Sequence, residues 1–145
     1  MLSAALERVL TVALREAQMR RHTHLTLEHL LFAAAHDPDG ERILQASGAD
    51  VERLRADLGR FLDEFPERNA RGPVRQPEQT LAFRRVLQSA VLHVQSAGKD
   101  EADVGDMLAA LLQQTNSHGV ALLLAQGVTR LDVLNYIAHG VTKHP

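Results

Sequence analysis

The sequence predicts an all-α protein made of two tandem four-helix repeats, and three observations lead to this fold class. Hydrophobic residues make up 45% of the chain but aromatic residues only 3%, so Leu, Ala and Val must build the core, which favours helices over a β-sandwich. Apolar residues recur at helical spacing between residues that begin and end helices. The same series returns 77 positions later, from Thr26 to Asp103. We therefore expect a duplicated helical body, with all 145 residues in one domain.

The first repeat, residues 1–62, begins with a helix that Ser3 caps and that ends near Arg21. Charged residues lie largely off its apolar stripe, so one face of the helix is expected to pack on the core. The stripe consists of Leu6, Val9, Leu10, Ala13, Leu14 and Ala17. A short polar turn over residues 22–25 follows.

Thr26 caps a second helix, which stops by His36 and is predicted to be the buried centre of the repeat. Glu28 stands in its first turn, where a negative charge meets the positive end of the helix dipole. Its second copy begins at Asp103, with apolar residues at the same spacing. These residues are Leu27, Leu30, Leu31 and Ala34 in the first copy and Val104, Met107, Leu108 and Leu111 in the second.

Two further helices complete the first repeat. Residues 37–40 combine two possible caps with a proline that a first helical turn tolerates, so a third helix is expected over roughly residues 41–47, ended by Gly48. Asp50 caps the fourth helix. Its apolar face consists of Val51, Leu54, Leu58, Phe61 and Leu62.

Residues 63–79 are predicted to be an exposed linker between the repeats, because the helical period disappears there among prolines, glycine and charged residues. The second repeat, residues 80–140, follows the plan of the first. Thr80 caps its first helix, and Gly98 ends it. Asp103 opens the next helix, Asn116 or Ser117 the third, which Gly127 closes, and Thr129 the fourth. Residues 141–145 begin an exit linker.

Charge and composition argue against several classes of function and of protein. The 16 basic and 18 acidic side chains are mixed along the chain, which gives no footprint for nucleic acid or an anionic membrane. The absence of cysteine excludes disulfides and thiolate metal sites. No stretch approaches the roughly 20 apolar residues of a membrane span, and charged residues interrupt any signal-like run at the N-terminus. We expect a cytoplasmic protein that is a monomer when isolated.

The motifs of common enzymes are missing. The sequence has no glycine-rich loop ending in Gly-Lys-Ser/Thr, no His-Glu-x-x-His zinc motif and no Gly-x-Ser-x-Gly motif. We therefore expect this domain to be non-catalytic and to carry no cofactor, and a duplicated helical domain of this kind suggests binding.

Two groups of polar residues have alternative interpretations. His22 and His24, with His29 nearby, are the best metal candidates, but without a carboxylate or cysteine to complete a set they are more simply solvated turn and cap histidines. Arg84 and Arg85 could contact an anion or carboxylate, although a basic pair on an amphipathic helix usually forms its solvated face.

Several runs of the sequence resemble a known family. The first is the N-terminal helix through Arg20-Arg21-His22 with the following Leu25–Leu31, and two more are Thr80–Gly98 and Val128–Gly140. Together they resemble the N-terminal domain of the Clp/Hsp100 AAA+ unfoldases, the Clp repeat domain, and the ClpA branch more than ClpB or ClpC. The resemblance covers essentially the whole chain, and residues 139–143 are similar to the lead into the first ATPase module.

This resemblance implies a pseudo-twofold domain of two four-helix repeats. It also implies that the domain docks the small adaptor ClpS, which delivers N-degron substrates to the ATPase modules in cis and, through them, to the peptidase ClpP. The alternative is direct binding of unfolded substrate polypeptides, as in related Clp and Hsp100 domains.

The resemblance also implies which residues contact the adaptor. Glu28 would offer a carboxylate to an adaptor lysine, and Thr80 a hydroxyl or backbone group. At position 23 the sequence has Thr where the ClpA pattern has an acidic residue, which puts one implied ion pair in doubt. The full set is Thr23, His24, Glu28, Thr80, Leu81, Arg84 and Arg85.

Overall fold

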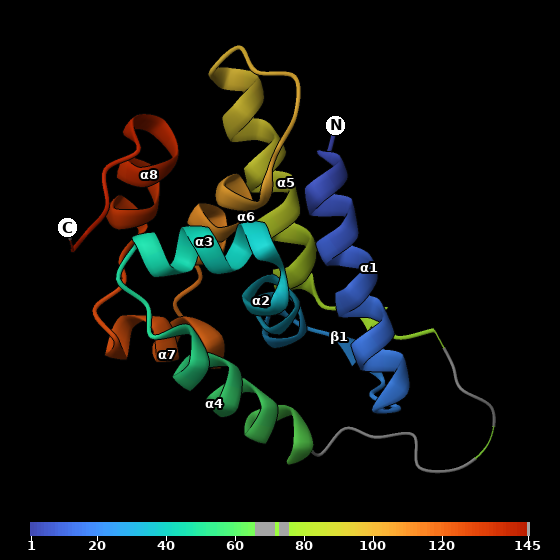
Figure 1. The fold of residues 1–145 in the computed structure, drawn as a ribbon. Coiled ribbons are helices and arrows are strands. Elements are labelled where there is room, and N and C mark those ends of the chain that lie inside the picture. Colours follow the sequence, from blue (N-terminus) through green and yellow to red (C-terminus); the bar gives the residue numbers. More distant parts are fainter. Residues whose placement is uncertain (66–71, 73–75, 145) are drawn as a thin grey trace.

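Eight helices and two short strands make up the part of the chain that the computed structural model describes, residues 1–65, 72 and 76–144 (Figure 1). The first half contains α1 (Ala4–Met19), β1 (His24–Leu25), α2 (Leu27–His36), α3 (Pro38–Ala46) and α4 (Val51–Asp63). The second half contains β2 (Glu78–Gln79), α5 (Leu81–Ser96), α6 (Val104–Leu111), α7 (His118–Ala125) and α8 (Arg130–His139). The all-α fold and the order of the helices confirm the fold class that the sequence predicts.

The predicted helix starts are confirmed because each cap binds a backbone N–H of its own first turn. Thr26, for example, accepts from the amide of His29, and Ser117 rather than Asn116 caps α7. The third helix begins earlier than predicted, at Pro38, since the Asp37 carboxylate accepts from the amides of Asp39 and Gly40 in its first turn. The N-caps are Ser3, Thr26, Asp37, Asp50, Thr80, Asp103, Ser117 and Thr129.

The segment before the first helix of each repeat pairs with the segment before the second helix of the other repeat. Leu25 of β1 pairs with Gln79 of β2 in parallel, and Leu2 forms an isolated parallel bridge with Ala102. Each residue of the second bridge lies 77 positions from one of the first, so the bridges are equivalent under exchange of the repeats. Each is reinforced by a backbone bond at a helix cap: the Ser3 amide donates to Ala102 O (2.9 Å) and the Thr80 amide to Leu25 O (3.1 Å). This reciprocity supports the pseudo-twofold arrangement.

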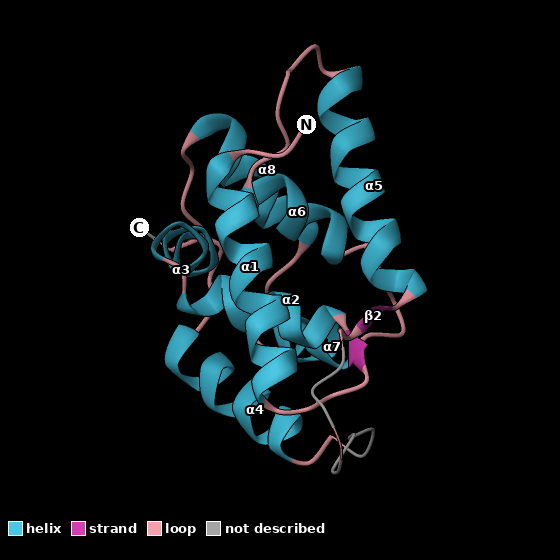
Figure 2. Cartoon of the chain, turned by 90° about the vertical axis from the view of Figure 1, so that its right-hand side faces the viewer, coloured by secondary structure: helices cyan, strands magenta, loops and turns pink. Residues whose placement is uncertain are grey.

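Helices α2 and α6 form the centre of one continuous core, as the two copies of the central motif predict. Every residue of α6 is buried, and α2 exposes mainly Phe32 and His36. The longer helix α1 and helix α4 pack against α2, and the longer helix α5 and helix α8 pack against α6 (Figures 1 and 2). The largest fully buried side chains come from both repeats: Leu6, Leu30, Leu31, Leu44, Leu54, Leu58, Leu62, Phe83, Met107, Leu108, Leu111 and Leu123.

The predicted polar turn and linker are partly wrong. Residues 22–25 are not a solvated turn, because His22 and Leu25 are buried and His24–Leu25 forms β1. The predicted linker begins inside α4 and its last residues before Thr80 form β2, so that it fastens the repeats together at this end. Residues 66–71 and 73–75 of the predicted linker lie outside the described residues.

Within the described residues, no single helix has the length and apolar character to cross a membrane. The pair α7 and α8, bent by 77°, passes that test only when the two helices are taken together.

Candidate functional site

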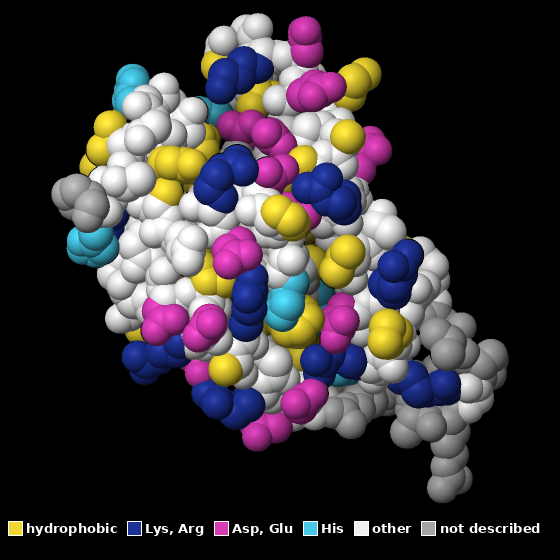
Figure 3. Space-filling view, in the orientation of Figure 1, with side chains coloured by type: hydrophobic (Ala, Val, Ile, Leu, Met, Phe, Trp, Pro, Cys, Tyr) yellow, Lys and Arg dark blue, Asp and Glu magenta, His cyan; other side chains and the backbone are white. Residues whose placement is uncertain are grey.

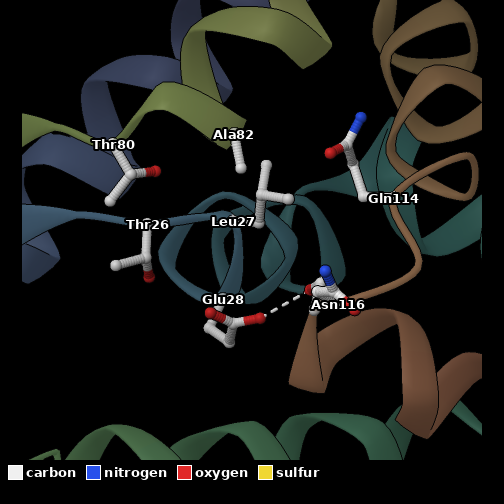
Figure 4. A pocket seen from close by; sticks show the side chains of 8 residues that line it. Thr26, Leu27, Glu28, Thr80, Ala82, Gln114 and Asn116 are labelled. Carbon is white, nitrogen blue, oxygen red and sulfur yellow. Dashed lines mark hydrogen bonds between the residues drawn. The ribbon is translucent and has the colours of Figure 1, made fainter.

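A pocket of about 230 Å³ lies where the starts of α2 and α5 meet the turn before α7 (Figure 4). It brings together two residues that the sequence analysis singles out, Glu28 and Thr80, from different repeats. The turn before α7 contributes side chains that the sequence analysis missed, because only the fold places them here. The lining residues are Thr26, Leu27, Glu28, Thr80, Ala82, Gln114, Asn116 and Ser117.

Glu28 is not the free surface carboxylate that the sequence suggests. Only 8% of the residue is exposed, and its Oε2 accepts from Ser117 Oγ (2.7 Å) and from the Gly119 amide (2.9 Å). Glycine at position 119 suits this close packing, since a Cβ there would lie 3.1 Å from a methyl group of Leu31. Glu28 therefore joins α2 of the first repeat to the positive N-terminal end of α7 in the second.

The other predicted contact residues form a more accessible edge beside the pocket. Thr80 caps α5 by accepting from the Phe83 amide (3.2 Å), and Leu81 is 56% exposed. The pairing of β1 with β2 brings Thr23 and His24 next to this helix start, because the Glu78 amide donates to Thr23 O (3.0 Å). The structure thus gathers predicted residues of both repeats on one edge.

His24 contacts residues of both repeats on this edge. Its Nδ1 lies 3.0 Å from Thr23 Oγ1, and its Nε2 lies 3.9 Å from a carboxylate oxygen of Glu78. Arg84 and Arg85 follow one turn later on α5 and are both exposed. The edge therefore offers a hydroxyl, an imidazole, an apolar side chain and two guanidinium groups.

The two repeats differ at the position of Arg85. Its equivalent in the first repeat, 77 residues earlier, is Arg8, which forms a bidentate pair with the Asp37 carboxylate (2.7 and 3.2 Å) and reaches Asp39 (3.3 Å). In the second repeat the segment that leads into α7, Gln113–Ser117, contains no acidic residue. Among the described residues, Arg85 has no carboxylate partner.

The candidate metal residues His22 and His29 do meet, but as a buried hydrogen-bonded pair. They are 2% and 0% exposed, and His22 Nδ1 lies 2.8 Å from His29 Nε2. His29 Nδ1 accepts from the Thr26 amide (3.0 Å), so the proton of the neutral ring is on Nε2 and is donated to His22. Burial, followed by the charges of His22 and Arg20, lowers the pKa of His29 to about 3.

The interpretation of these residues as solvated histidines is therefore wrong for His22 and His29, although His29 does complete the cap of α2. His24 lies apart from the pair, on the exposed edge. Within the described residues, no group of three His, Cys, Asp or Glu side chains could hold a metal ion.

A second, apolar groove of about 240 Å³ runs between α1 and α5. Its lining comes from both helices and from β1, β2 and the residues before β2: Leu10, Thr11, Leu14, Leu25, Gln76, Pro77, Gln79, Phe83 and Leu87. Leu87 also borders a shallow apolar surface formed with Leu2, Gln88, Val91 and Leu92, of which Leu92 is 63% exposed. On the face shown in Figure 3, basic and acidic side chains are interspersed, with no large patch of one sign.

A family model and a related protein both match this chain. The model of the Clp repeat (R) N-terminal domain family matches residues 1–126. A ClpA homolog protein of Fuscovulum blasticum is 39% identical over 146 residues, covering 99% of this chain but only 18% of the relative. The chain thus spans less than a fifth of that protein.

Two solved structures share the fold. The Hsp104 N-terminal domain from Candida albicans superposes with a TM-score of 0.75 at 15% identity, covering 91% of this chain and 85% of that one. A ClpV N-domain in complex with a VipB peptide gives a TM-score of 0.73 at 22% identity, covering 95% and 85%. With eight helices in the described residues and a family match over most of its length, the chain belongs to the Clp repeat (R) N-terminal domain family.

Proposed function

We propose that this chain is the protein-docking N-domain of a ClpA-type unfoldase and that its partner is the adaptor ClpS. The observation that carries the proposal is the difference between the repeats. Arg8 is paired with Asp37, whereas Arg85, three residues after the pocket-lining Ala82 on α5, is exposed and has no carboxylate partner among the described residues. A partner that supplies a carboxylate would complete in the second repeat the contact that the first repeat makes internally.

The rest of the edge suits a polar, protein-sized partner. Thr23 and His24 from one repeat and Thr80 and Leu81 from the other lie on either side of the β1–β2 pairing. Glu28 first shapes the pocket, because its Oε2 fixes α7 against α2. Its second carboxylate oxygen, Oε1, is the atom that would face an adaptor lysine at the pocket.

Charge reversal at Arg85 tests this site by calorimetric titration with the ClpS of the same organism. We expect Arg85→Glu to weaken binding roughly 10-fold or more, because a cation that pairs with a partner carboxylate becomes a repelling anion. Arg53→Glu is the matched control, since Arg53 is an exposed arginine on α4, away from the pocket. Equal losses in both variants, or none in either, would remove Arg85 from the interface.

A second candidate function is direct binding of unfolded polypeptide in the apolar groove between α1 and α5. The groove supports it because Leu10, Leu14 and Leu87 give it a nonpolar lining and Leu25 and Phe83 form its base. The ClpV N-domain, which has this fold, is known in complex with a peptide. Such binding needs no adaptor.

Fluorescence anisotropy with a labelled, reduced and carboxymethylated α-lactalbumin separates the two functions. If the groove binds substrate, Leu87→Asp abolishes binding of this unfolded protein and leaves ClpS binding intact. If the wild-type domain binds ClpS but not the unfolded protein, the groove has no such role.

We propose further that the longer protein is an ATP-dependent unfoldase of the cytoplasm that works with ClpP, with this domain supplying no catalytic residue. The support is the ClpA homolog, of which this chain matches 18%. An ATPase assay of the full-length protein, with and without this domain, tests that division of labour.

A further inference from the structure

The residues after α8 do not continue away from the domain but fold back onto it. Gly140 adopts the left-handed conformation (φ 67°), and its amide donates to Tyr136 O (2.8 Å), which ends the helix. The next amide, of Val141, donates to Asn135 O (3.4 Å). The chain then runs toward the first repeat, although the sequence alone predicts a simple exit linker here.

Lys143 connects this segment to both repeats. Its backbone amide donates to Ala46 O at the end of α3 (2.8 Å). Its ammonium group donates to Asp132 Oδ2 on α8 (2.8 Å) and to Gly127 O, which follows α7. One residue thus bonds to the first repeat through its main chain and to the second through its side chain.

The glycines that end α3 and α7 accommodate this lysine. Gly48 and Gly127 occupy equivalent places in the two repeats, with φ angles of 100° and 79°. A Cβ at Gly48 would lie 2.8 Å from Lys143 Cδ, so the lysine stem occupies the space that glycine leaves free. Beside it, Gln126 makes a reciprocal pair of bonds with the backbone of Asp50 (2.9 and 3.3 Å). The segment therefore crosses the repeats at a place where they already contact each other.

We infer that residues 140–144 form a strap that fastens the two repeats together at the end opposite the β1–β2 pairing. In this arrangement the chain leaves the domain from the junction of the repeats and not from the free end of α8. A force applied at the C-terminal end of the strap then acts on α3 and on the turn between α7 and α8 together. This inference is independent of the identity of the adaptor.

The lysine content of the chain provides a direct test, because Lys99 and Lys143 are its only two lysines. Lys99 is exposed in the turn after α5 and serves as an internal control. Under limiting N-hydroxysuccinimide acetate at fixed pH, mass spectrometry of the intact domain's peptides gives both labelling rates. We expect Lys143 to react about 10-fold more slowly than Lys99, because its ammonium must first leave two acceptors. Equal rates would overturn the strap.

Two variants test the bonds themselves. Asp132→Asn should raise the labelling rate of Lys143 and leave that of Lys99 unchanged, while Asp57→Asn, which changes a carboxylate that pairs with arginines of α4 and not with Lys143, should leave both unchanged. If Asp132→Asn does not fold, hydrogen exchange of the backbone amide of residue 143 provides the test instead. The amide of residue 143 should be protected in the wild-type domain and lose that protection in Lys143→Met. Fast exchange at residue 143 in the wild-type protein contradicts the inference.

Discussion

Replacing Glu28 by Ala is the sharpest test of how the repeats are joined. The change removes the acceptor of two hydrogen bonds, from Ser117 Oγ and from the buried Gly119 amide. A hydrogen bond to a charged group contributes about 1.5–3 kcal/mol, and both bonds end on one oxygen, so we expect a loss of about 3 kcal/mol in the free energy of unfolding. For a domain of this size that corresponds to a decrease in Tm of about 6–12 °C.

Thermal and urea unfolding followed by circular dichroism measure this loss. Glu7→Ala is the matched control, because Glu7 is also an acidic residue in a first helical turn but is exposed on α1. It should change the free energy of unfolding by about 0.5 kcal/mol or less. A Glu28→Ala domain as stable as the Glu7→Ala domain would refute the structural role of Glu28.

This role changes how adaptor-binding experiments at Glu28 must be designed. Glu28→Lys, which would reverse the charge offered to an adaptor lysine, is one such experiment. The structure predicts that an ammonium at this position would face the Gly119 amide, which is itself a donor, and would destabilise the domain. Weaker ClpS binding by Glu28→Lys is therefore informative only when the stability of the variant is measured as well.

Three further predictions concern stability. Because the pKa of His29 is lowered to about 3, the folded state binds fewer protons than the unfolded state from there up to the ordinary value of 6.5. Stability should therefore decrease as the pH is lowered from 6.5 toward 3, by up to about 1.4 kcal/mol per pH unit, and His29→Gln should flatten the urea-unfolding profile; an unchanged slope would exclude His29 as its source. Gly40→Ala would bring a Cβ to 2.0 Å from Ala34 O, so a loss of about 3 kcal/mol or more is expected, and a wild-type Tm would contradict the close approach of α2 and α3. Ser117→Ala should cost about 1–2 kcal/mol and be less than additive with Glu28→Ala in a double-mutant cycle, whereas full additivity would show that the two side chains do not interact.

Local chemistry made most of the fold predictable from the sequence. A cap such as Thr26 or Asp50 acts within its own first turn, so its role is decided by residues next to it in the chain. The apolar stripes identified the buried faces for the same reason. The repeat at 77 positions then gave the order of the helices and the central place of α2 and α6.

Contacts between distant residues account for what the sequence could not reveal. Glu28 looked like a helix-dipole charge, because its partners Ser117 and Gly119 are 89 and 91 positions away. His22 looked solvated for a similar reason, since it lies beside polar residues in the sequence but packs against His29 and Phe65 in the fold.

Arg85 stands out because the two repeats differ in the pairing of this arginine, and not because it belongs to a motif. The Arg84-Arg85 pair gave only a weak signal in the sequence, because exposed basic pairs are common on helices. Its significance emerged when the structure showed Arg8, the equivalent residue, held by Asp37 and Asp39. The acidic residues at the start of α3 have no counterpart in the neutral segment before α7. A comparison of these two segments could have revealed the difference from the sequence alone.

Hydrogen exchange of this domain with and without saturating ClpS tests the proposed docking site most directly. We expect slower exchange at residues 23–28 and 80–85 and in the segment before α7, with the outer face of α4 unchanged. Protection confined to the apolar groove between α1 and α5, or no protection at a ClpS concentration that saturates calorimetric binding, would contradict it.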